Sequence, residues 1–495
     1  MPYAIGACLV AVAAAYKSFT HVYLEDALIT FRFAENIASG HGFVFNLGER
    51  VLGTTTPLYT ILLALFGSVF GVGHLWTISN VLVALAFAGT GVSVYLALVE
   101  LHWPPWVGAL AALVSAFDFR ALNNGVGGME TGLVTCLMMA SLLFMIRKQY
   151  VAMGIALGCL QLTRPDAVFW ELLACGYLLF TDRRAILTVM SCLFAVNIPW
   201  WIFAYSYFGT IIPHSVLAKL QAAPGVESVL ISAWNSRSNY YLPTYPGKAS
   251  VGFVLIGAWT LFRDSSWKSP LILLLLFPPV YFLGLSIGRA PYFPWYYVPS
   301  SLTASVVASL GIAFFLDEIG RRLGKSAAPR TVRAIKASLV MILAVDMTYM
   351  VSLEGLRQRR DSANEVGLRQ AVGEWIATHT PADAVVAMEA IGYQGYYSRR
   401  TVFDMAGLVS PRALTIRDRT GDGFHRLVSE VQPDYLVLRA FEVQRNENFA
   451  WGGPLFRTPE QKAYFSQHYR LAKHFVAPDE VLWGELATLD VFERQ

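Results

Sequence analysis

Two adjacent carboxylates, Glu25 and Asp26, follow the first apolar stretch of the chain. A carboxylate can act as a general base on an acceptor hydroxyl, and a pair can hold a hard divalent cation such as Mg, Mn or Ca. The same two residues precede the run ALITFRFAENIA, where they would place favourable negative charge at the amino end of a helix. Spacing alone leaves catalysis, metal binding and helix capping open.

Basic residues that could bind an anion lie in three other connections. Lys219 stands in FGTIIPHSVLAKL, and its compact charge suits a phosphate. Arg164 and Arg289 could make forked contacts to the same anion. The alternatives are snorkelling of Lys219 towards lipid headgroups and an ion pair between Arg164 and Asp166.

Further polar and aromatic side chains gather in these connections. Sugars and isoprenoids are bound by aromatic residues of the kind that also form an interfacial belt, so composition cannot separate the two uses. The candidates for lining a substrate cavity are His41, Glu130, Asp166, His214, Tyr292, Trp295 and Tyr297. Together with the acids and bases, they predict one aqueous-facing cavity built from five connections.

The composition indicates which elements must position these residues. Only 15% of the 495 residues are charged, against roughly 25% in soluble proteins, and the mean hydropathy is +0.47. That excludes a soluble globular enzyme, and a net charge of +4 is too mild to indicate nucleic acid as a partner. Long apolar runs fill residues 1–352, whereas residues 353–495 are rich in charged and amide side chains. We expect a transmembrane domain followed by a soluble domain at these ranges.

The arrangement of the spans depends on one segment. A hydrocarbon core of about 30 Å needs roughly 20 apolar residues per helix. If residues 55–71 span, the amino terminus lies outside; if they form an interfacial helix, residues 20–74 are one outer loop and about eleven spans remain. We favour the interfacial helix, with the soluble domain outside. The cytoplasmic side is then the side of four basic connections: residues 147–148, 183–184, 263–268 and 321–336.

The soluble domain has mixed secondary structure. Apolar residues recur at helical spacing over residues 364–378. Gly, Pro and Asp clusters separate four later β-type runs, at Val385–Met388, Thr401–Asp404, Tyr435–Leu438 and Thr488–Phe492. These patterns predict an α/β domain.

Several stretches, taken together and in order, resemble bacterial GT-C superfamily glycosyltransferases, in particular an arabinofuranosyl- and mannosyltransferase-like branch. The resemblance covers nearly the whole chain and rests on LEDALITFRFAENIASGHGFVFNLGERVLGTTTPLYT, GGMETGL, LTRPDA, FGTIIPHSVLAK, YFPWYYVP and IGYQGYYSRRTVFDMAGLVSP. It implies a polytopic α-helical GT-C-like protein of the bacterial cytoplasmic (inner) membrane, with an extracytoplasmic C-terminal α/β domain. Proteins of this superfamily have interfacial helices in their first large outer loop, so the resemblance implies that residues 55–71 do not span.

The resemblance also implies an activity. Such enzymes transfer a sugar from a polyprenyl-phosphate carrier to an acceptor hydroxyl on a glycan, lipid or protein during cell-envelope glycan or glycoconjugate synthesis. Asp26 is then the expected general base, and Glu25 its partner or a metal ligand. Lys219 would bind the carrier phosphate, with Arg164 and Arg289 as helpers.

Two departures from the resemblance matter for these roles. Related sequences commonly have two aspartates where this chain has Glu25 and Asp26, so which acid is the base stays open. His214 replaces the asparagine expected after the proline, so its part in sugar or acceptor binding is open too. Glu130 and Asp166 are expected to organise the cavity.

Two other functions compete with glycosyl transfer. An oligosaccharide ligase would also use a lipid-linked donor at an outer-face cavity. A transporter or flippase for lipid-linked sugars would place ionisable groups near the middle of spans, whereas the acids here lie at one face.

Overall fold

The computed structural model describes residues 1–495 apart from 223–244, 265–268, 289–292, 324–327, 418–421 and 448–452. Arg289 and Tyr292 therefore lie outside the described residues. The chain divides into two compact units. The first, here called the helical unit, contains Met1–Phe19, Asn80–Trp200 and Pro224–Leu356. The second, the mixed unit, contains Thr20–Ser79, Trp201–Ala223 and Arg357–Gln495.

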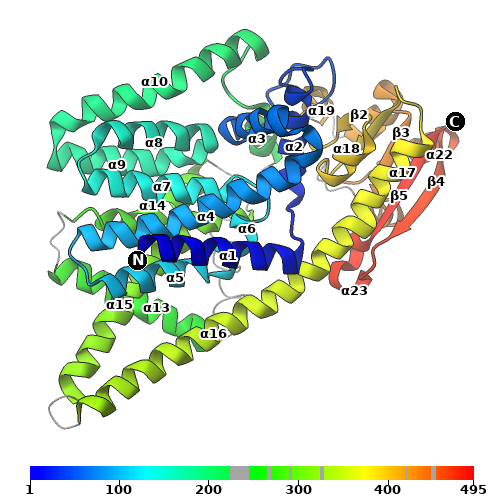
Figure 1. The fold of residues 1–495 in the computed structure, drawn as a ribbon. Helices are drawn as coiled ribbons and strands as arrows, with labels where there is room; N and C mark the ends of the chain where they lie inside the picture. The colour runs from blue at the N-terminus through cyan, green and yellow to red at the C-terminus, as the bar shows by residue number, and fades with distance from the viewer. Residues whose placement is uncertain (223–244, 265–268, 289–292, 324–327, 418–421, 448–452) are drawn as a thin grey trace. The chain divides into compact units, whose positions relative to one another are not determined.

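The helical unit is built from helices that lie side by side (Figure 1). Its principal helices, four of which include residues of the mixed unit, are α1 (Pro2–Thr20), α4 (Leu75–Glu100), α5 (Pro105–Ala116), α6 (Phe119–Gly125), α7 (Thr131–Ile146), α8 (Tyr150–Thr163), α9 (Val168–Thr181), α10 (Arg183–Phe208), α13 (Tyr245–Asp264), α14 (Ile272–Ile287), α15 (Tyr297–Leu323) and α16 (Pro329–Asn364). Short 3-10 turns, η2 (Pro165–Ala167) and η3 (Pro294–Tyr296), precede α9 and α15.

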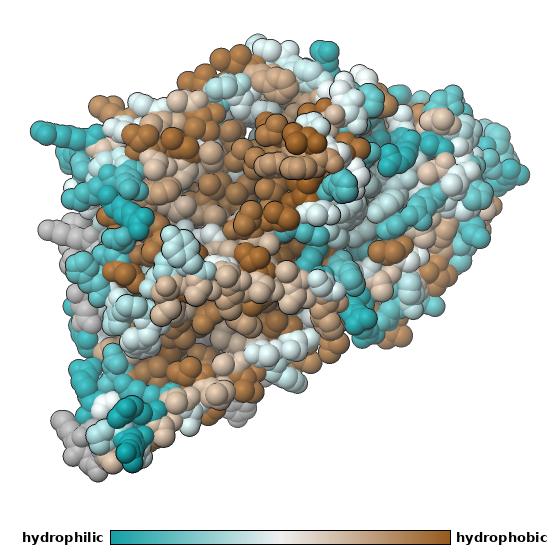
Figure 2. Space-filling model, in the orientation of Figure 1, coloured by the Kyte–Doolittle hydropathy of each residue, from teal (hydrophilic) through white to brown (hydrophobic). Residues whose placement is uncertain are grey.

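Many of these helices are apolar around much of their circumference, as expected where helices meet both a core and lipid. Large apolar side chains such as Leu172, Phe180, Leu187 and Ile202 are exposed, and Figure 2 shows an extensive apolar face over these helices. Among the described residues, five helices are long and apolar enough to cross a membrane, or six if the bent pair of α5 and α6 counts as one span. Shorter apolar helices accompany them, and the number eleven stays a prediction.

The 62° bend between α5 and α6 has a local cause. The Asp118 side chain accepts hydrogen bonds from the backbone N–H groups of Arg120 (2.8 Å) and Ala121 (3.3 Å), so it caps α6 and starts a new helix direction. The hydroxyl of Ser301, from α15, also donates to Asp118. The apolar helix that begins at Pro105 therefore ends at Ala116.

The mixed unit joins the first connection of the chain to its carboxyl-terminal part. Its helices and turns are α2 (Glu25–Ala38), α3 (Pro57–Phe70), η1 (Val72–His74), α11 (His214–Ala222), the π-turn η4 (Glu365–Gln370), α17 (Ala371–His379), α18 (Tyr393–Ser398), α19 (Pro411–Arg417), α20 (Gly423–Arg426), the π-turn η5 (Leu427–Val431), α21 (Ala440–Arg445), α22 (Pro459–His468), α23 (Glu480–Trp483) and η6 (Gly484–Ala487). The compact units thus do not follow a linear division at residue 352, because residues 20–79 pack with the carboxyl-terminal residues.

A five-stranded sheet forms the centre of the carboxyl-terminal part. Its order is β2 (Thr401–Asp404), β1 (Val385–Met388), β3 (Tyr435–Arg439), β5 (Thr488–Arg494) and β4 (Tyr469–Val476). The strands β2, β1 and β3 are parallel, whereas β5 pairs antiparallel with β3 and β4. The buried side chains of Ala387, Phe424, Leu436, Phe465 and Phe492 belong to its core.

The predicted α/β domain and its four strands are confirmed, and a fifth strand, β4, was missed. The predicted helix over residues 364–378 is present, but it is not a separate element. It continues α16 through the π-turn η4 into α17, so one helical path runs from Pro329 to His379.

Candidate active site

The acid pair lies at the first turn of α2. Glu25 and Asp26 follow the N-cap residue Leu24, and no side chain makes a capping hydrogen bond there. Both side chains are partly exposed. Their charge still favours this helix end, but the two carboxylates have different surroundings.

Glu25 is held by the carboxyl-terminal part of the mixed unit. The backbone N–H of Gly392, which precedes α18, donates to Glu25 Oε1. A Cβ atom at position 392 would overlap the Glu25 backbone oxygen, so the close approach requires glycine. Burial and the neighbouring charge of Asp26 raise the pKa of Glu25 well above its ordinary value, while the positive charge of Arg369 opposes that shift.

Asp26 has no comparable anchor. Among the described residues, its side chain makes no hydrogen bond or ion pair, and it remains partly exposed beside Glu25. The lone pairs of an unengaged carboxylate are available to an incoming hydroxyl, which suits a general base. The structure thus separates two acids that the sequence left equivalent.

The rest of the first connection is fastened to the same part of the unit. Arg32, on α2, donates to the backbone oxygens of Gly395 (2.5 Å) and Arg400 (2.7 Å). The buried Asn46 amide donates to the oxygen of Val402 (2.8 Å) and accepts from its N–H (3.0 Å), which continues the hydrogen bonding of β2. These contacts satisfy buried backbone groups and fix the position of α2.

Lys219 and His214 lie in the mixed unit as well, on α11. Lys219 is partly exposed. The backbone N–H of His214 donates to Leu52 at 2.7 Å, which ties α11 to the first connection. His214 Nε2 is buried with no hydrogen-bond partner among the described residues, and burial lowers the pKa of this ring. His41, in contrast, is exposed after α2.

A separate polar cluster occupies the helical unit. Arg164 Nε and Nη2 donate to the two carboxylate oxygens of Asp166, at 2.9 and 3.0 Å, and Nη1 lies 3.7 Å from Glu130 Oε1. The Tyr281 hydroxyl donates to Asp166, and the Tyr296 ring centroid lies 4.6 Å from the Arg164 guanidinium carbon. The ion-pair alternative for Arg164 is therefore present, and both carboxylates organise the guanidinium.

The aromatic candidates of the helical unit, Trp295 and Tyr297, flank Tyr296 in the sequence, whose ring contacts Arg164. The ring of Trp295 stacks on Phe293 with a centroid separation of 4.7 Å. Tyr297 is buried, and the Arg120 guanidinium carbon lies 5.3 Å from its ring centroid. Here the aromatic residues pack against one another and against an arginine.

The predicted site residues thus fall into three sets. The mixed unit holds Glu25, Asp26, His41, His214 and Lys219; the helical unit holds Glu130, Arg164, Asp166, Trp295 and Tyr297; and Arg289 and Tyr292 lie outside the described residues. A single cavity that joins all of them stays a prediction.

Sequence reasoning missed three residues of these clusters. Tyr281 stands in the apolar run FPPVYFLG, where it looks like any other residue of a span. Glu365 and Arg369 have the i,i+4 spacing of an ordinary surface ion pair. No local pattern links this pair to Glu25, more than 300 residues away in sequence, although the charges of both residues affect the pKa of Glu25.

The acid pair can supply part of a metal site. Mg²⁺ is typically held by one or two carboxylates together with substrate phosphates, which matches the number of carboxylates here. In the described part of the chain, no group of three or more His, Cys, Asp and Glu side chains is arranged so that it could hold a metal ion. A divalent cation therefore stays a prediction.

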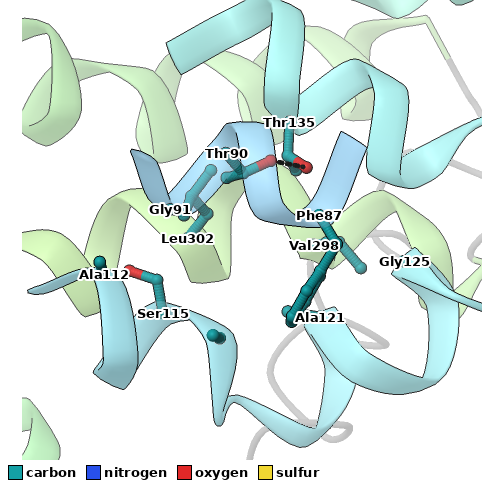
Figure 3. Close-up of a pocket in the computed structure, with 11 residues that line it drawn as sticks. Phe87, Thr90, Gly91, Ala112, Ser115, Ala121, Gly125, Thr135, Val298 and Leu302 are labelled. Atoms are coloured by element: carbon teal, nitrogen blue, oxygen red, sulfur yellow. Dashed lines mark hydrogen bonds between the residues drawn. The ribbon is translucent and has the colours of Figure 1, made fainter. Parts of the chain in front are cut away.

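Two hollows among the described residues are lined by neither Glu25 nor Asp26. The hollow in Figure 3 lies between helices of the helical unit, where small residues such as Gly91 and Ala112 allow close packing and Thr90 bonds Thr135 at 3.1 Å. Its volume of about 20 Å³ holds no more than a water molecule. A larger hollow of about 560 Å³ is lined by Asp383 and Tyr464 among others. Asp383 precedes β1 in the chain, whereas Gly392, which bonds Glu25, follows β1.

Comparison with known proteins identifies the fold. ArnT from Cupriavidus metallidurans matches 98% of this chain over 97% of its own length, with a TM-score of 0.56 and 15% identity in the apo state. The same protein bound to undecaprenyl phosphate gives a TM-score of 0.55 and 14% identity over the same shares. The chain has the fold of the GT-C membrane glycosyltransferases, and it is a multi-pass membrane protein. The fold predicted from the resemblance is confirmed.

Two shorter matches cover parts of the chain. A "Terminal beta-(1->2)-arabinofuranosyltransferase" of Mycobacterium tuberculosis (strain ATCC 25618 / H37Rv) is 27% identical over 239 residues, which is 44% of this chain and 38% of that protein. The family described as "Domain of unknown function (DUF8728)" matches residues 357–491, which hold the sheet and its helices.

Proposed function

We propose that this protein transfers a sugar from a polyprenyl-phosphate carrier to an acceptor hydroxyl, with Asp26 as the general base. The observation that carries the proposal is the contrast at the start of α2, where Glu25 is anchored and Asp26 is unengaged among the described residues. It occurs in a chain whose fold matches ArnT, a protein that has been seen with undecaprenyl phosphate.

The chemistry follows from the parts. The bond between the anomeric carbon and the carrier phosphate breaks, and the phosphate leaves with the electron pair. The acceptor oxygen forms the new bond to that carbon, while its proton passes to the Asp26 carboxylate. Phosphate is already a competent leaving group, so the reaction needs cationic stabilisation of the departing charge but no general acid. Lys219 is the proposed cation, and Arg289 is a proposed helper.

Arg164 is better placed as an organiser than as a phosphate ligand. Its guanidinium already makes the forked contact with Asp166 and faces Glu130, and both acids are close to it in a largely buried cluster. Two carboxylates around one guanidinium leave a net negative cluster, which does not favour a phosphate. We therefore assign Arg164, Glu130 and Asp166 to holding the shape of the helical unit.

The sidedness of the mixed unit supports an extracytoplasmic site. Residues 20–79 pack in one unit with the carboxyl-terminal residues, which supports a common side of the membrane for both. The positive-inside bias of the basic connections favours the outer side for the carboxyl-terminal part, and a spanning α3 would then put residues 20–54 on the opposite side. The proposed location is the bacterial cytoplasmic membrane.

The sugar proposed first is a furanose pentose. The partial match to an arabinofuranosyltransferase supports arabinofuranose as donor sugar and a cell-envelope glycan as acceptor. Purified full-length protein should be incubated with a panel of polyprenyl-phosphate sugars that includes arabinofuranose, together with an oligoarabinoside acceptor. Turnover of at least one donor is expected from the wild type, and turnover of none would refute the proposal.

A further inference from the structure

Residues 389–392 form a short turn between β1 and α18, and this turn contacts the start of α2. The backbone N–H of Gly392 donates to the Glu25 side chain, and a Cβ atom at position 392 would overlap the Glu25 backbone oxygen. Both contacts join the last residue of the turn to the neighbour of Asp26. The position of the turn therefore affects where the first residues of α2 lie.

The backbone of this turn is strained at Ala390. Its φ angle is +67°, in the left-handed region that residues with a Cβ atom rarely adopt. Such a conformation persists only where the surrounding structure imposes it, and it is found especially at functional sites. Contacts of the neighbouring residues must therefore hold the turn in place.

Glu389, the residue before Ala390, is held by an arginine of the adjacent strand. The strands β1 and β3 are parallel neighbours, so their carboxyl ends lie at the same edge of the sheet. Arg439, the last residue of β3, forms an ion pair with Glu389. The two side chains are only 12% and 24% exposed, so water and salt screen this pair less than they would a pair on the surface.

Arg439 is itself fixed by Glu442 on α21. Its Nη1 atom donates to Glu442 Oε1 at 3.4 Å, and its backbone N–H donates to Glu442 Oε2 at 2.8 Å. The Glu442 side chain is buried. Because one guanidinium joins both carboxylates, Glu389 is tied to the framework of the sheet and α21.

The contact with Gly392 acts at a different place on α2 from the other bonds of this helix. Arg32, about two turns after Glu25, donates to the backbone oxygens of Gly395 and Arg400. Those bonds fix the middle of the helix. The Gly392 N–H acts at the first turn, where the acid pair lies.

We infer that Glu389 and Arg439 are positioning residues of the active site: their ion pair holds the turn at residues 389–392, and the turn holds Glu25 and thereby orients Asp26 towards the acceptor. This inference rests on the proposed function. It gives the sheet of the carboxyl-terminal part a share in aligning the base, through two side chains that act by way of Gly392.

The variant Glu389→Gln of the full-length protein tests this chain of contacts. It removes the charge of Glu389 and leaves the pair of Arg439 with Glu442 in place. Loss of an outer partner of a functional group typically costs about ten- to a hundredfold in activity, so kcat should fall by a factor of this order. The KM values for donor and acceptor should change little.

The matched control is Glu485→Gln, which removes a carboxylate that pairs with another arginine of α21, Arg445. Both side chains of that pair are about half exposed, and the pair does not involve the turn at residues 389–392. Glu485→Gln should therefore keep the kcat of the wild type. Equal kcat in Glu389→Gln and Glu485→Gln would overturn the inference.

A double variant separates positioning from general destabilisation. Glu25→Ala removes the acceptor of the Gly392 N–H, so the turn no longer acts on the Glu25 side chain. Adding Glu389→Gln to Glu25→Ala should cause no further loss of kcat, whereas independent effects would multiply. Multiplied losses would count against positioning through Glu25.

Hydrogen exchange provides a readout that does not depend on activity. The backbone amides of residues 389–393 should exchange faster in Glu389→Gln than in Glu485→Gln, while exchange in α22 should be the same in both and in the wild type. Faster exchange in α22 of Glu389→Gln would show general destabilisation and overturn the inference.

The same measurement distinguishes failure of the inference from failure of the proposed function. Faster exchange confined to the turn, in a protein that turns over no donor, would support the hold on Glu25 and refute the proposed function. Unchanged exchange of the turn, in a protein that is active, would refute the inference and leave the proposed function standing.

Discussion

At the scale of single residues, the two acids at the start of α2 are chemically alike and structurally different. Glu25 accepts a hydrogen bond from Gly392 and lies in the field of Arg369, whereas Asp26 is unengaged among the described residues. A general base needs a lone pair within reach of the acceptor hydroxyl, and Asp26 has both carboxylate oxygens available. The difference therefore assigns different tasks to the two neighbours.

Substituting each acid by its amide should separate these tasks. Asp26→Asn removes the proton acceptor and should lower the transfer rate by about a hundredfold to ten-thousandfold. Glu25→Gln keeps an oxygen that can accept from Gly392, so we expect a smaller loss, about tenfold. Steady-state transfer rates of the two purified variants provide the comparison. A larger loss in Glu25→Gln than in Asp26→Asn would reverse the assignment.

Removal of the charge of Lys219 should affect the donor more than the acceptor. In Lys219→Ala the departing phosphate loses its proposed cation, so donor affinity should fall by about tenfold or more, while acceptor affinity stays close to that of the wild type. Titration with a polyprenyl-phosphate sugar measures this, and Lys462→Ala, at an exposed position of the sheet domain, is the control. Equal donor affinity in the three proteins would exclude Lys219 from the phosphate site.

The sequence revealed the types of the site residues but few of their partners. The ion pair of Arg164 with Asp166 could be anticipated, because only one residue separates them. The bond from Gly392 to Glu25 joins positions 367 residues apart, and no local pattern signals it. Tyr281 was hidden for a different reason, since an apolar run gives no indication that one hydroxyl meets a carboxylate.

At the scale of elements, the close approach of α2 to the residue before α18 gives a further prediction. Gly392→Ala places a methyl group against the backbone oxygen of Glu25, and overpacking of this kind typically costs about 1–3 kcal/mol. The Tm of the purified protein should fall, and transfer should weaken as Glu25 is displaced. Gly453→Ala, where an added Cβ meets no atom within 4 Å, should leave both unchanged. Identical Tm values for the two variants would contradict the packing.

Four strands could be predicted from alternating or continuous apolar runs, and β4 could not. Its sequence, YRLAKHFV, carries Arg470, Lys473 and His474, and most of its side chains are exposed. It lies at the edge of the sheet, where basic residues discourage pairing with another chain. The charges that protect the edge thus remove the pattern from which a strand is recognised.

The join between the last long helix and the soluble part was hidden in a similar way. Apolar spacing near residues 364–378 predicts a helix, but a π-turn leaves almost the same pattern as an α-helix. Only the hydrogen bonding of residues Glu365–Gln370 reveals the extra residue in the turn. That turn carries the ion pair of Arg369 with Glu365.

At the scale of the whole molecule, the carboxyl-terminal part of the chain packs with residues near the amino terminus. Residues 20–79 and the sheet-bearing residues after 357 form one compact unit, although most of the apolar helices separate them in sequence. A linear division at residue 352 cannot describe this, because hydropathy reports length and polarity and not which loops pack together. The apolar composition nevertheless sufficed to predict a membrane protein, and the ordered motifs sufficed to predict the GT-C fold.

The proposed sidedness can be tested with single cysteines. Val481 is 93% exposed in the mixed unit, and Arg184 is exposed in a basic connection of the helical unit. In intact cells, an impermeant maleimide should label Val481→Cys, while Arg184→Cys should react only after lysis. The wild type, with its five native cysteines, serves as the background control. Labelling of Val481→Cys only after lysis would reverse the topology.

The most direct test of the central claim follows both products of one reaction. Wild type and Asp26→Asn are incubated with polyprenyl-phosphate arabinofuranose and an oligoarabinoside, and mass spectrometry quantifies the released polyprenyl phosphate and the extended acceptor. We predict that the wild type forms the two in equal amounts and that Asp26→Asn forms neither at a comparable rate. Release of polyprenyl phosphate without an extended acceptor, or equal transfer by both proteins, would contradict the account.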